Sequence, residues 1–137
     1  MVLLSKIDQT TQMLKKVLDL RTKNQQVIGS NIANAETPGY STKSFEFEDQ
    51  LRNALSENTM KPVASHSNHI PIQTMELSKI QGTLSSNPDN TGIGDENSVS
   101  VDQEMVKLAE NQILYEAAIT MLNKKLSLLK YTINGGA

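Results

Sequence analysis

The chain has 137 residues, with 13 basic and 15 acidic side chains and a net charge of -2. Proteins that bind nucleic acid usually carry a basic excess, so this balance argues against a nucleic-acid partner. Cys is absent, which excludes disulfides, thiolate metal sites and Cys nucleophiles. Only 37% of the residues are apolar and 4% are aromatic, which is little for a globular domain of this length. We therefore expect an elongated chain, or one that completes its core with other subunits.

The first segment, residues 1–36, is predicted to form one long helix because it contains no Pro and a single Gly, Gly29. Two stripes with helical spacing run along it. The first stripe holds Leu4, Ile7, Thr11, Leu14, Leu18, Arg21, Gln25, Ile28 and Ile32. The second holds Met13, Val17, Leu20, Asn24, Val27, Asn31 and Asn34. Two partial stripes predict a helix that contacts more than one neighbour.

The middle segment, residues 37–98, holds all four Pro residues and is predicted to be an irregular, partly extended connecting region. Phe47, Leu51 and Leu55 indicate one short amphipathic helix near residues 46–56. The sequence allows a short extended piece at residues 70–72. A connection of this length is unusual for an ordinary loop.

The last segment, residues 99–137, gives the clearest helical signal, because residues 99–134 contain neither Gly nor Pro. Alternating spacings of three and four residues predict a coiled-coil seam of Met105, Leu108, Gln112, Tyr115, Ile119, Leu122, Leu126, Leu129 and Ile133. Ser100 to Gln103 fits a capping box, with Asp102 as an alternative cap, and Gly135 and Gly136 end the helix. The predicted fold is mainly α, with the two long helices paired as an antiparallel coiled-coil hairpin.

The junction after the first helix, residues 29–40, is more specific than a helix end requires. Asn31 and Asn34 lie three residues apart on one helical face, where their amides can bind backbone groups that a helix end leaves open. Pro38 moves Thr37 out of the helical conformation, and Pro38-Gly39 suits the centre of a type II turn.

Patterns for catalysis or metal binding are weak. His66 and His69 form an H-x-x-H pair, but the closest carboxylate is Glu76, so loop histidines without a ligand role are the better interpretation. Residues 89–96 resemble a calcium loop superficially but lack the EF-hand order of ligands, so they are interpreted as a polar turn. We predict no catalytic residue, no metal, no cofactor and no small-molecule substrate.

The junction resembles the N-terminal signature of the bacterial flagellar axial proteins, approximately A-N-N-x-A-N-x-x-T-P-G-Y. The matching residues are Asn31, Ala33, Asn34, Thr37, Pro38, Gly39 and Tyr40, while Ser30 departs from it. The family's C-terminal signature, roughly E-M-V-x-L-x-x-x-Q-x-x-Y-E-A, is matched by Glu104, Met105, Val106, Leu108, Gln112, Tyr115, Glu116 and Ala117. Two signatures in the right order at the two ends argue against a chance match.

The resemblance implies a non-enzymatic, self-assembling structural subunit of the flagellar drive shaft, which transmits torque and forms the wall of an export channel. Longer members of the family insert domains between their helices, so this short chain resembles the proximal rod proteins of the basal body. Its uninterrupted Thr-Pro-Gly-Tyr favours one of their two short types. The C-terminal motif and the seam, with Glu104 and Glu116, would then serve assembly.

The resemblance also implies partners and a location. The partners are copies of the chain, other rod proteins, the rod–MS ring junction protein and the export gate. The location is the periplasmic rod, reached by type III export without a cleaved signal peptide, and the first residues indeed lack the order of such a peptide. The alternatives are a sister rod or junction component, a generic helical-hairpin adaptor, and a small enzyme that uses His66 or His69.

Overall fold

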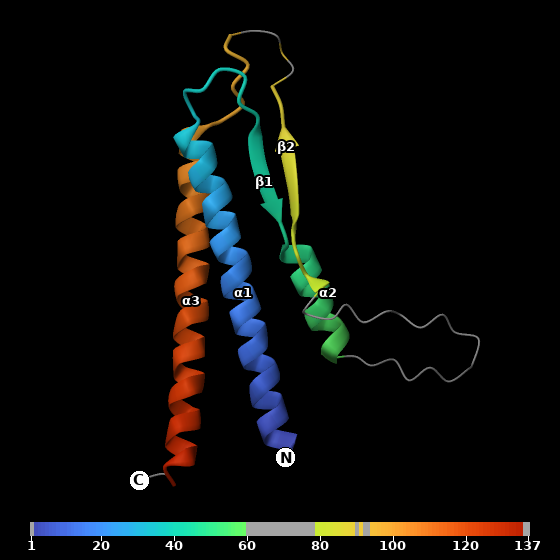
Figure 1. Cartoon of the computed structure of the whole chain (residues 1–137), viewed down its shortest axis with the longest axis vertical. Helices are drawn as coiled ribbons and strands as arrows, with labels where there is room; N and C mark the ends of the chain where they lie inside the picture. The colour runs from blue at the N-terminus through green and yellow to red at the C-terminus, as the bar shows by residue number, and fades with distance from the viewer. Residues whose placement is uncertain (1, 60–78, 90, 92–93, 136–137) are drawn as a thin grey trace, which may run out of the picture.

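The computed structural model describes residues 2–59, 79–89, 91 and 94–135. Two long helices form most of it, α1 (Val2–Ala33) and α3 (Val101–Ile133). They run antiparallel and side by side, so the start of α1 and the end of α3 lie at the same end of the molecule (Figure 1). The predicted fold class, mainly helical with paired terminal helices, is confirmed.

The two ends of α3 agree only in part with the sequence analysis. Ser100 occupies the N-cap position in an extended conformation, but its side chain makes no cap hydrogen bond, so the capping-box prediction is wrong. Asp102 and Glu104 lie in the first turn, where the helix dipole favours acidic groups. At the far end the backbone N–H of Asn134 donates to the Lys130 carbonyl, and Gly135 has a φ of +75°, which gives the predicted glycine stop.

A two-stranded antiparallel sheet lies beside α1, on the flank opposite α3 in Figure 1. Its strands are β1 (Thr42–Glu46) and β2 (Thr83–Asn87), and the pairing runs from Thr42 with Asn87 to Glu46 with Thr83. Neither strand is predicted from the sequence. The extended piece that it allows at residues 70–72 lies outside the described residues.

The helix α2 (Glu48–Thr59) follows β1 directly and completes a small hydrophobic core. The core contains Leu20 from α1, Ala54 from α2, and the side chains of Phe47 and Ile80. Phe45 packs against this core, and its ring covers Gly82 so closely that a Cβ at Gly82 would overlap the ring. The short helix expected near residues 46–56 corresponds to α2.

The molecule is elongated, with α1 in contact with both α3 and the sheet (Figure 1). Leu14 and Ile28 from the first predicted stripe of α1 are buried, and so are Leu20 and Asn31 from the second. The prediction that α1 contacts more than one neighbour is therefore confirmed. Within the described ranges, no helix combines the length and the apolar character that crossing a membrane requires.

Candidate functional site

The motif at the end of α1 turns the chain from the helix into β1. The backbone N–H of Tyr40 donates to the Thr37 carbonyl (3.2 Å), and Gly39 has a φ of +70°. A positive φ at the third position is the requirement of a type II turn, and Gly meets it without strain. The turn predicted from Pro38-Gly39 is therefore observed, and it brings Tyr40 back beside α1.

Asn31 joins three elements through one buried amide. It has 0% exposure, and its Nδ2 donates to the Lys43 carbonyl (2.7 Å) in β1 and to Glu104 Oε2 (2.8 Å) in α3. Its Oδ1 accepts the backbone N–H of Lys43 (3.0 Å) and the hydroxyl of Tyr40 (3.3 Å). The amide thus pairs with the β1 backbone as a neighbouring strand would, while it also contacts α3. We call Asn31, Tyr40, Lys43, Glu104 and Lys107 the Asn31 cluster.

Glu104 is the partner of Asn31 on the second signature. Its side chain is 2% exposed, and Oε1 accepts the Lys107 ammonium (2.6 Å) while Oε2 accepts the Asn31 amide. A buried carboxylate destabilises a protein unless it is paired and hydrogen-bonded, and both oxygens meet that condition. The two signatures, 73 positions apart in the chain, therefore meet at one polar contact.

A second set of contacts ties the end of α1 to the segment before α3. The Asn97 amide nitrogen lies 2.8 to 2.9 Å from the carbonyl oxygens of Asn34, Ala35 and Thr37. Helix ends leave some carbonyls without a backbone donor, and Asn97 supplies one to Ala35. The Asn34 and Thr37 carbonyls accept Asn97 in addition to the backbone N–H groups of Thr37 and Tyr40. The Asn34 side chain donates to the Ser30 carbonyl (2.7 Å), as expected for an amide that satisfies the backbone at a helix end.

A similar polar contact lies further along the hairpin, around Asn111. Asn111 is 1% exposed; it accepts the Asn24 amide (3.1 Å) and Arg21 Nη1 (3.4 Å), and it donates to the Arg21 carbonyl (3.0 Å). The Arg21 guanidinium also reaches Glu48 (3.0 Å) and lies over the Phe47 ring, 5.0 Å from its centroid. Arg21 therefore links α3, α1 and the start of α2.

The two polar contacts define the register of the hairpin. Asn24 faces Asn111 and Asn31 faces Glu104, and on each helix the two residues are seven positions apart. Polar residues in a helix seam reduce stability but specify one alignment. A slip by one heptad would leave a buried amide or carboxylate without its partner, which costs about 1–3 kcal/mol for each group.

The seam of α3 against α1 differs from the predicted seam at every second place. Leu108, Tyr115, Leu122 and Leu129, four residues of the predicted seam, are half-buried. The buried residues between them are Glu104, Asn111 and Ala118, and Lys125 continues the series. The prediction also places Met105, Gln112, Ile119 and Leu126 in the seam, but Met105, Gln112 and Leu126 are exposed and only Ile119 is half-buried. Each of the four follows a residue of the buried series by one position, and Met105 and Leu126 are 58% and 48% exposed.

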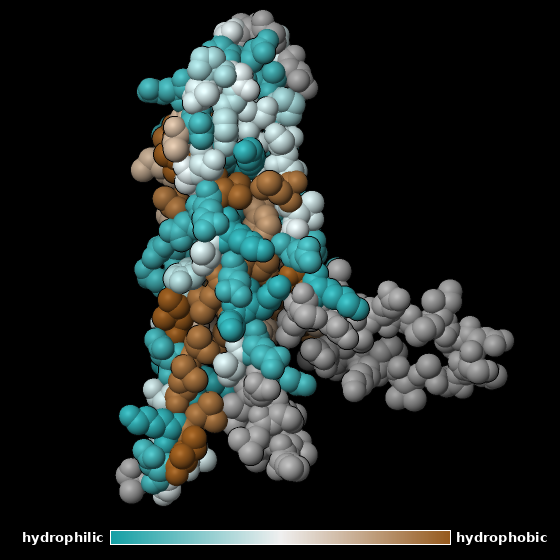
Figure 2. Space-filling model, in the orientation of Figure 1, coloured by the Kyte–Doolittle hydropathy of each residue, from teal (hydrophilic) through white to brown (hydrophobic). Residues whose placement is uncertain are grey.

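The displaced apolar residues remain on the surface of α3. We call Met105, Ile119, Leu126 and Ile133 the first stripe, since each follows a seam position by one residue. Leu114, Met121 and Leu128 form the second stripe, since each precedes a seam position by one residue. Among the described side chains, ten of the eleven large apolar residues that are exposed belong to α3, which makes this helix the candidate interaction surface. Figure 2 shows apolar side chains following the lower half of the helix.

The described residues meet few of the requirements of a catalytic or metal-binding site. A cavity of about 220 Å³ lies between α1, β1 and α3, but Arg21 on its wall pairs with Glu48, and Lys107 pairs with Glu104. No group of three or more His, Asp or Glu that could hold a metal is present among the described residues. The pair His66 and His69 lies outside those residues. The contacts therefore serve to hold elements together.

The polar contacts of several residues are not predicted from the sequence. Asn97, Asn111 and Arg21 make the contacts described above, yet sequence reasoning gives none of them a structural role as a polar contact. For Asn111 a signal exists, because it lies seven residues after Glu104 on the same helical face. Glu116 and Gln112, by contrast, lie on the exposed surface and bind each other (2.9 Å), so their motif positions face outward.

Comparisons with known proteins give one consistent result. A family described as "Flagella basal body rod protein" matches residues 18–40, which include Asn31 and the turn after α1. The FlgB flagellar basal body rod protein of Bacillus subtilis is 31% identical over 127 aligned positions, covering 93% of this chain and 95% of that protein. The FlgB proteins of Salmonella typhimurium and Yersinia enterocolitica are 27% and 29% identical, covering 98% and 88% of this chain.

Proposed function

The chain belongs to the FlgB family of flagellar basal body rod proteins, and we propose that it builds the proximal rod through the exposed face of α3. It is a structural subunit of the basal body rod, and it assembles with other components of the flagellar basal body. The observation that carries the proposed mode of assembly is the concentration of exposed apolar side chains on one helix.

The apolar face of α3 gives the physical reason for assembly. Burying apolar surface contributes about 25 cal/mol per Å², or roughly 1.5–3 kcal/mol for a large side chain that becomes fully buried. Soluble monomers rarely expose large apolar patches, and ten exposed large apolar side chains lie on α3. Contacts between copies that use two different surfaces do not have to close, and they can extend into a helical array. A rod is such an array, with its channel wall formed by the paired helices.

In this proposal the two signature motifs have different structural roles. The N-terminal motif holds together the end of the hairpin at which α1 ends and α3 begins, through the Asn31 cluster and the Asn97 contacts. The motif residues are Asn31, Ala33, Asn34, Thr37, Pro38, Gly39 and Tyr40. The C-terminal motif contributes Glu104 to that cluster, while Met105 and its successors in the first stripe face neighbouring subunits. The motif thus provides both an internal contact and an external one.

The proposal extends to partners and location. Copies of the chain, other rod proteins, the rod–MS ring junction protein and the export gate are the expected partners. We expect export through the flagellar type III apparatus without a cleaved signal peptide, and a final position in the periplasmic rod that transmits torque. The absence of catalysis, of a cofactor and of a small-molecule substrate also belongs to the proposal.

Electron microscopy of basal bodies from a strain that lacks the gene tests this function. We expect membrane rings without a rod or hook, and restoration of both by the intact gene. Intact rods and hooks in the deletion strain would refute the rod assignment and favour a helical-hairpin adaptor. If a His69→Ala variant also restores the rod in the deletion strain, the result argues against the enzyme alternative.

A further inference from the structure

We propose that the two apolar stripes of α3 dock onto each other between neighbouring copies of the chain. The first stripe of one copy packs against the second stripe of the next, with the two α3 helices parallel and shifted along their length by about a third of the helix. This inference rests on the proposed rod function and specifies the surfaces by which the copies meet.

The positions of the stripes make each copy able to offer both halves of the contact. Each first-stripe residue follows a seam position and each second-stripe residue precedes one, so the two stripes lie on opposite flanks of the seam with α1. Within each stripe the residues recur at multiples of seven positions, as in the pairs Ile119 and Leu126, and Leu114 and Met121. Two parallel helices can interdigitate side chains with this common spacing.

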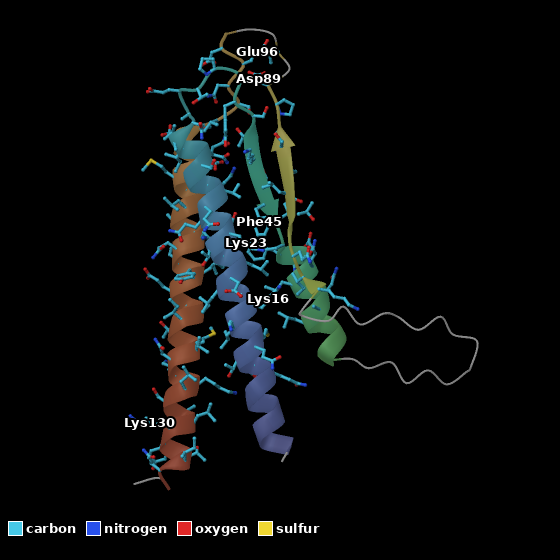
Figure 3. All side chains as sticks on the ribbon, viewed as in Figure 1. Lys16, Lys23, Phe45, Asp89, Glu96 and Lys130 are labelled. Carbon is cyan, nitrogen blue, oxygen red and sulfur yellow. The ribbon has the colours of Figure 1, made fainter. Side chains whose placement is uncertain are left out.

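The charges of α3 favour the shift between the copies. The first half of the helix carries the exposed acids Asp102, Glu110 and Glu116, and the second half carries the exposed Lys124 and Lys130. Within the described residues none of these five side chains forms a salt bridge. Figure 3 shows Lys130 pointing away from α1, near the end of α3.

Parallel copies at the same height would place acidic groups beside acidic groups and lysines beside lysines. A shift of about 12 residues, roughly 18 Å at 1.5 Å per residue, sets Leu126 and Ile133 of one copy level with Leu114 and Met121 of the next. The same shift places the basic half of the first copy beside the acidic half of the second. Exposed ion pairs contribute only about 0–1 kcal/mol each, so they select the alignment while the apolar stripes supply the affinity.

The use of two different stripes also explains why copies can keep adding to the array. Once the first stripe of one copy is covered, its second stripe remains free for a third copy, so the array grows in one direction. A closed dimer that uses the same stripe on both copies would instead cover two identical surfaces and end growth. The two arrangements predict different cross-links.

Cysteine cross-linking in purified basal bodies tests the docking, since the natural chain contains no Cys. Two chains with one Cys each are co-expressed and treated with a short flexible bis-maleimide. The shifted mixtures are Leu126→Cys with Leu114→Cys, and Ile133→Cys with Met121→Cys, so that both pair residues twelve positions apart in the same direction. The mixture at equal height is Ile119→Cys with Met121→Cys. Each variant expressed alone, and Ile113→Cys on the exposed face of α3 opposite the seam, serve as controls.

We expect a dimer band from both shifted mixtures and none from any single variant alone. A chain that carries both Leu114→Cys and Leu126→Cys should give a ladder of multimers. Cross-linking of single variants with themselves would overturn the opposite-stripe contact, and cross-linking of only the equal-height mixture would overturn the shift. Basal bodies that contain the variants but give no cross-link from any mixture would refute the docking altogether. Absence of the chain from purified basal bodies would refute the proposed function on which the docking depends.

Discussion

Replacing Asn31 by Ala removes the central contact of the Asn31 cluster. Four hydrogen bonds disappear at once, two with the backbone of Lys43, one with the Tyr40 hydroxyl and one with the buried Glu104 carboxylate. A neutral hydrogen bond contributes about 0.5–1.5 kcal/mol net, one to a charged group about 1.5–3, and a buried group left unpaired costs about 1–3 kcal/mol. The higher helix propensity of Ala returns about 0.5 kcal/mol. We expect the free energy of unfolding to fall by about 3 kcal/mol.

Urea denaturation of the full chain, followed by circular dichroism, measures this loss. Asn123→Ala is the matched control, because Asn123 lies on the exposed surface of α3 and the same substitution should change stability by less than about 0.5 kcal/mol. A double-mutant cycle between Asn31→Ala and Glu104→Ala should give a coupling energy of about 1 kcal/mol or more. A loss for Asn31→Ala no larger than that of the control, or additive effects in the cycle, would refute the claim that this cluster joins the two helices.

Four further substitutions test other parts of the structure. Gly82→Ala should lower the free energy of unfolding by about 2 kcal/mol, because the added Cβ would overlap the Phe45 ring. Gly29→Ala should raise it by roughly 0.5–1 kcal/mol, because Gly29 lies in α1 with open space around it. The urea midpoints of the two variants compare these effects. Leu20→Ala should cost about 3 kcal/mol because Leu20 fills the small core, and an unchanged urea midpoint would contradict that placement. Leu122→Asp places a charge in the helix seam and should abolish rod assembly and swimming in soft agar; normal swimming would refute the seam assignment.

The long helices were predictable because their signals are local. Uninterrupted segments without Pro, with apolar residues at helical spacing, were enough to predict α1, α3 and their antiparallel pairing. The turn at Pro38-Gly39 was predictable for the same reason, since the required positive φ belongs to one residue. Short-range chemistry therefore predicted both the helices and the place where the chain turns.

The seam and the strands depend on long-range contacts and were not predictable from local pattern. The apolar spacing places Met105 and Gln112 in the predicted seam. The structure instead buries Glu104 and Asn111, because α1 supplies hydrogen-bond partners for them. The strands β1 and β2 contain mostly Thr, Ser and other polar residues, so their apolar alternation is weak. Their pairing joins Thr42 with Asn87, far apart in the chain, which periodicity in a short window does not detect.

The fixed alignment of α1 and α3 makes the subunit a rod with two distinguishable ends. Because the polar pairs allow one register, the first turn of α1 and the last turn of α3 come out level, and Asp89 and Glu96 lie at the opposite end (Figure 3). The 32 residues of α1 separate the two ends by roughly 48 Å. A peptide tag at either terminus therefore marks the same end, while a label at Asp89 marks the other. Electron microscopy of labelled basal bodies could then read which way each subunit points along the drive shaft.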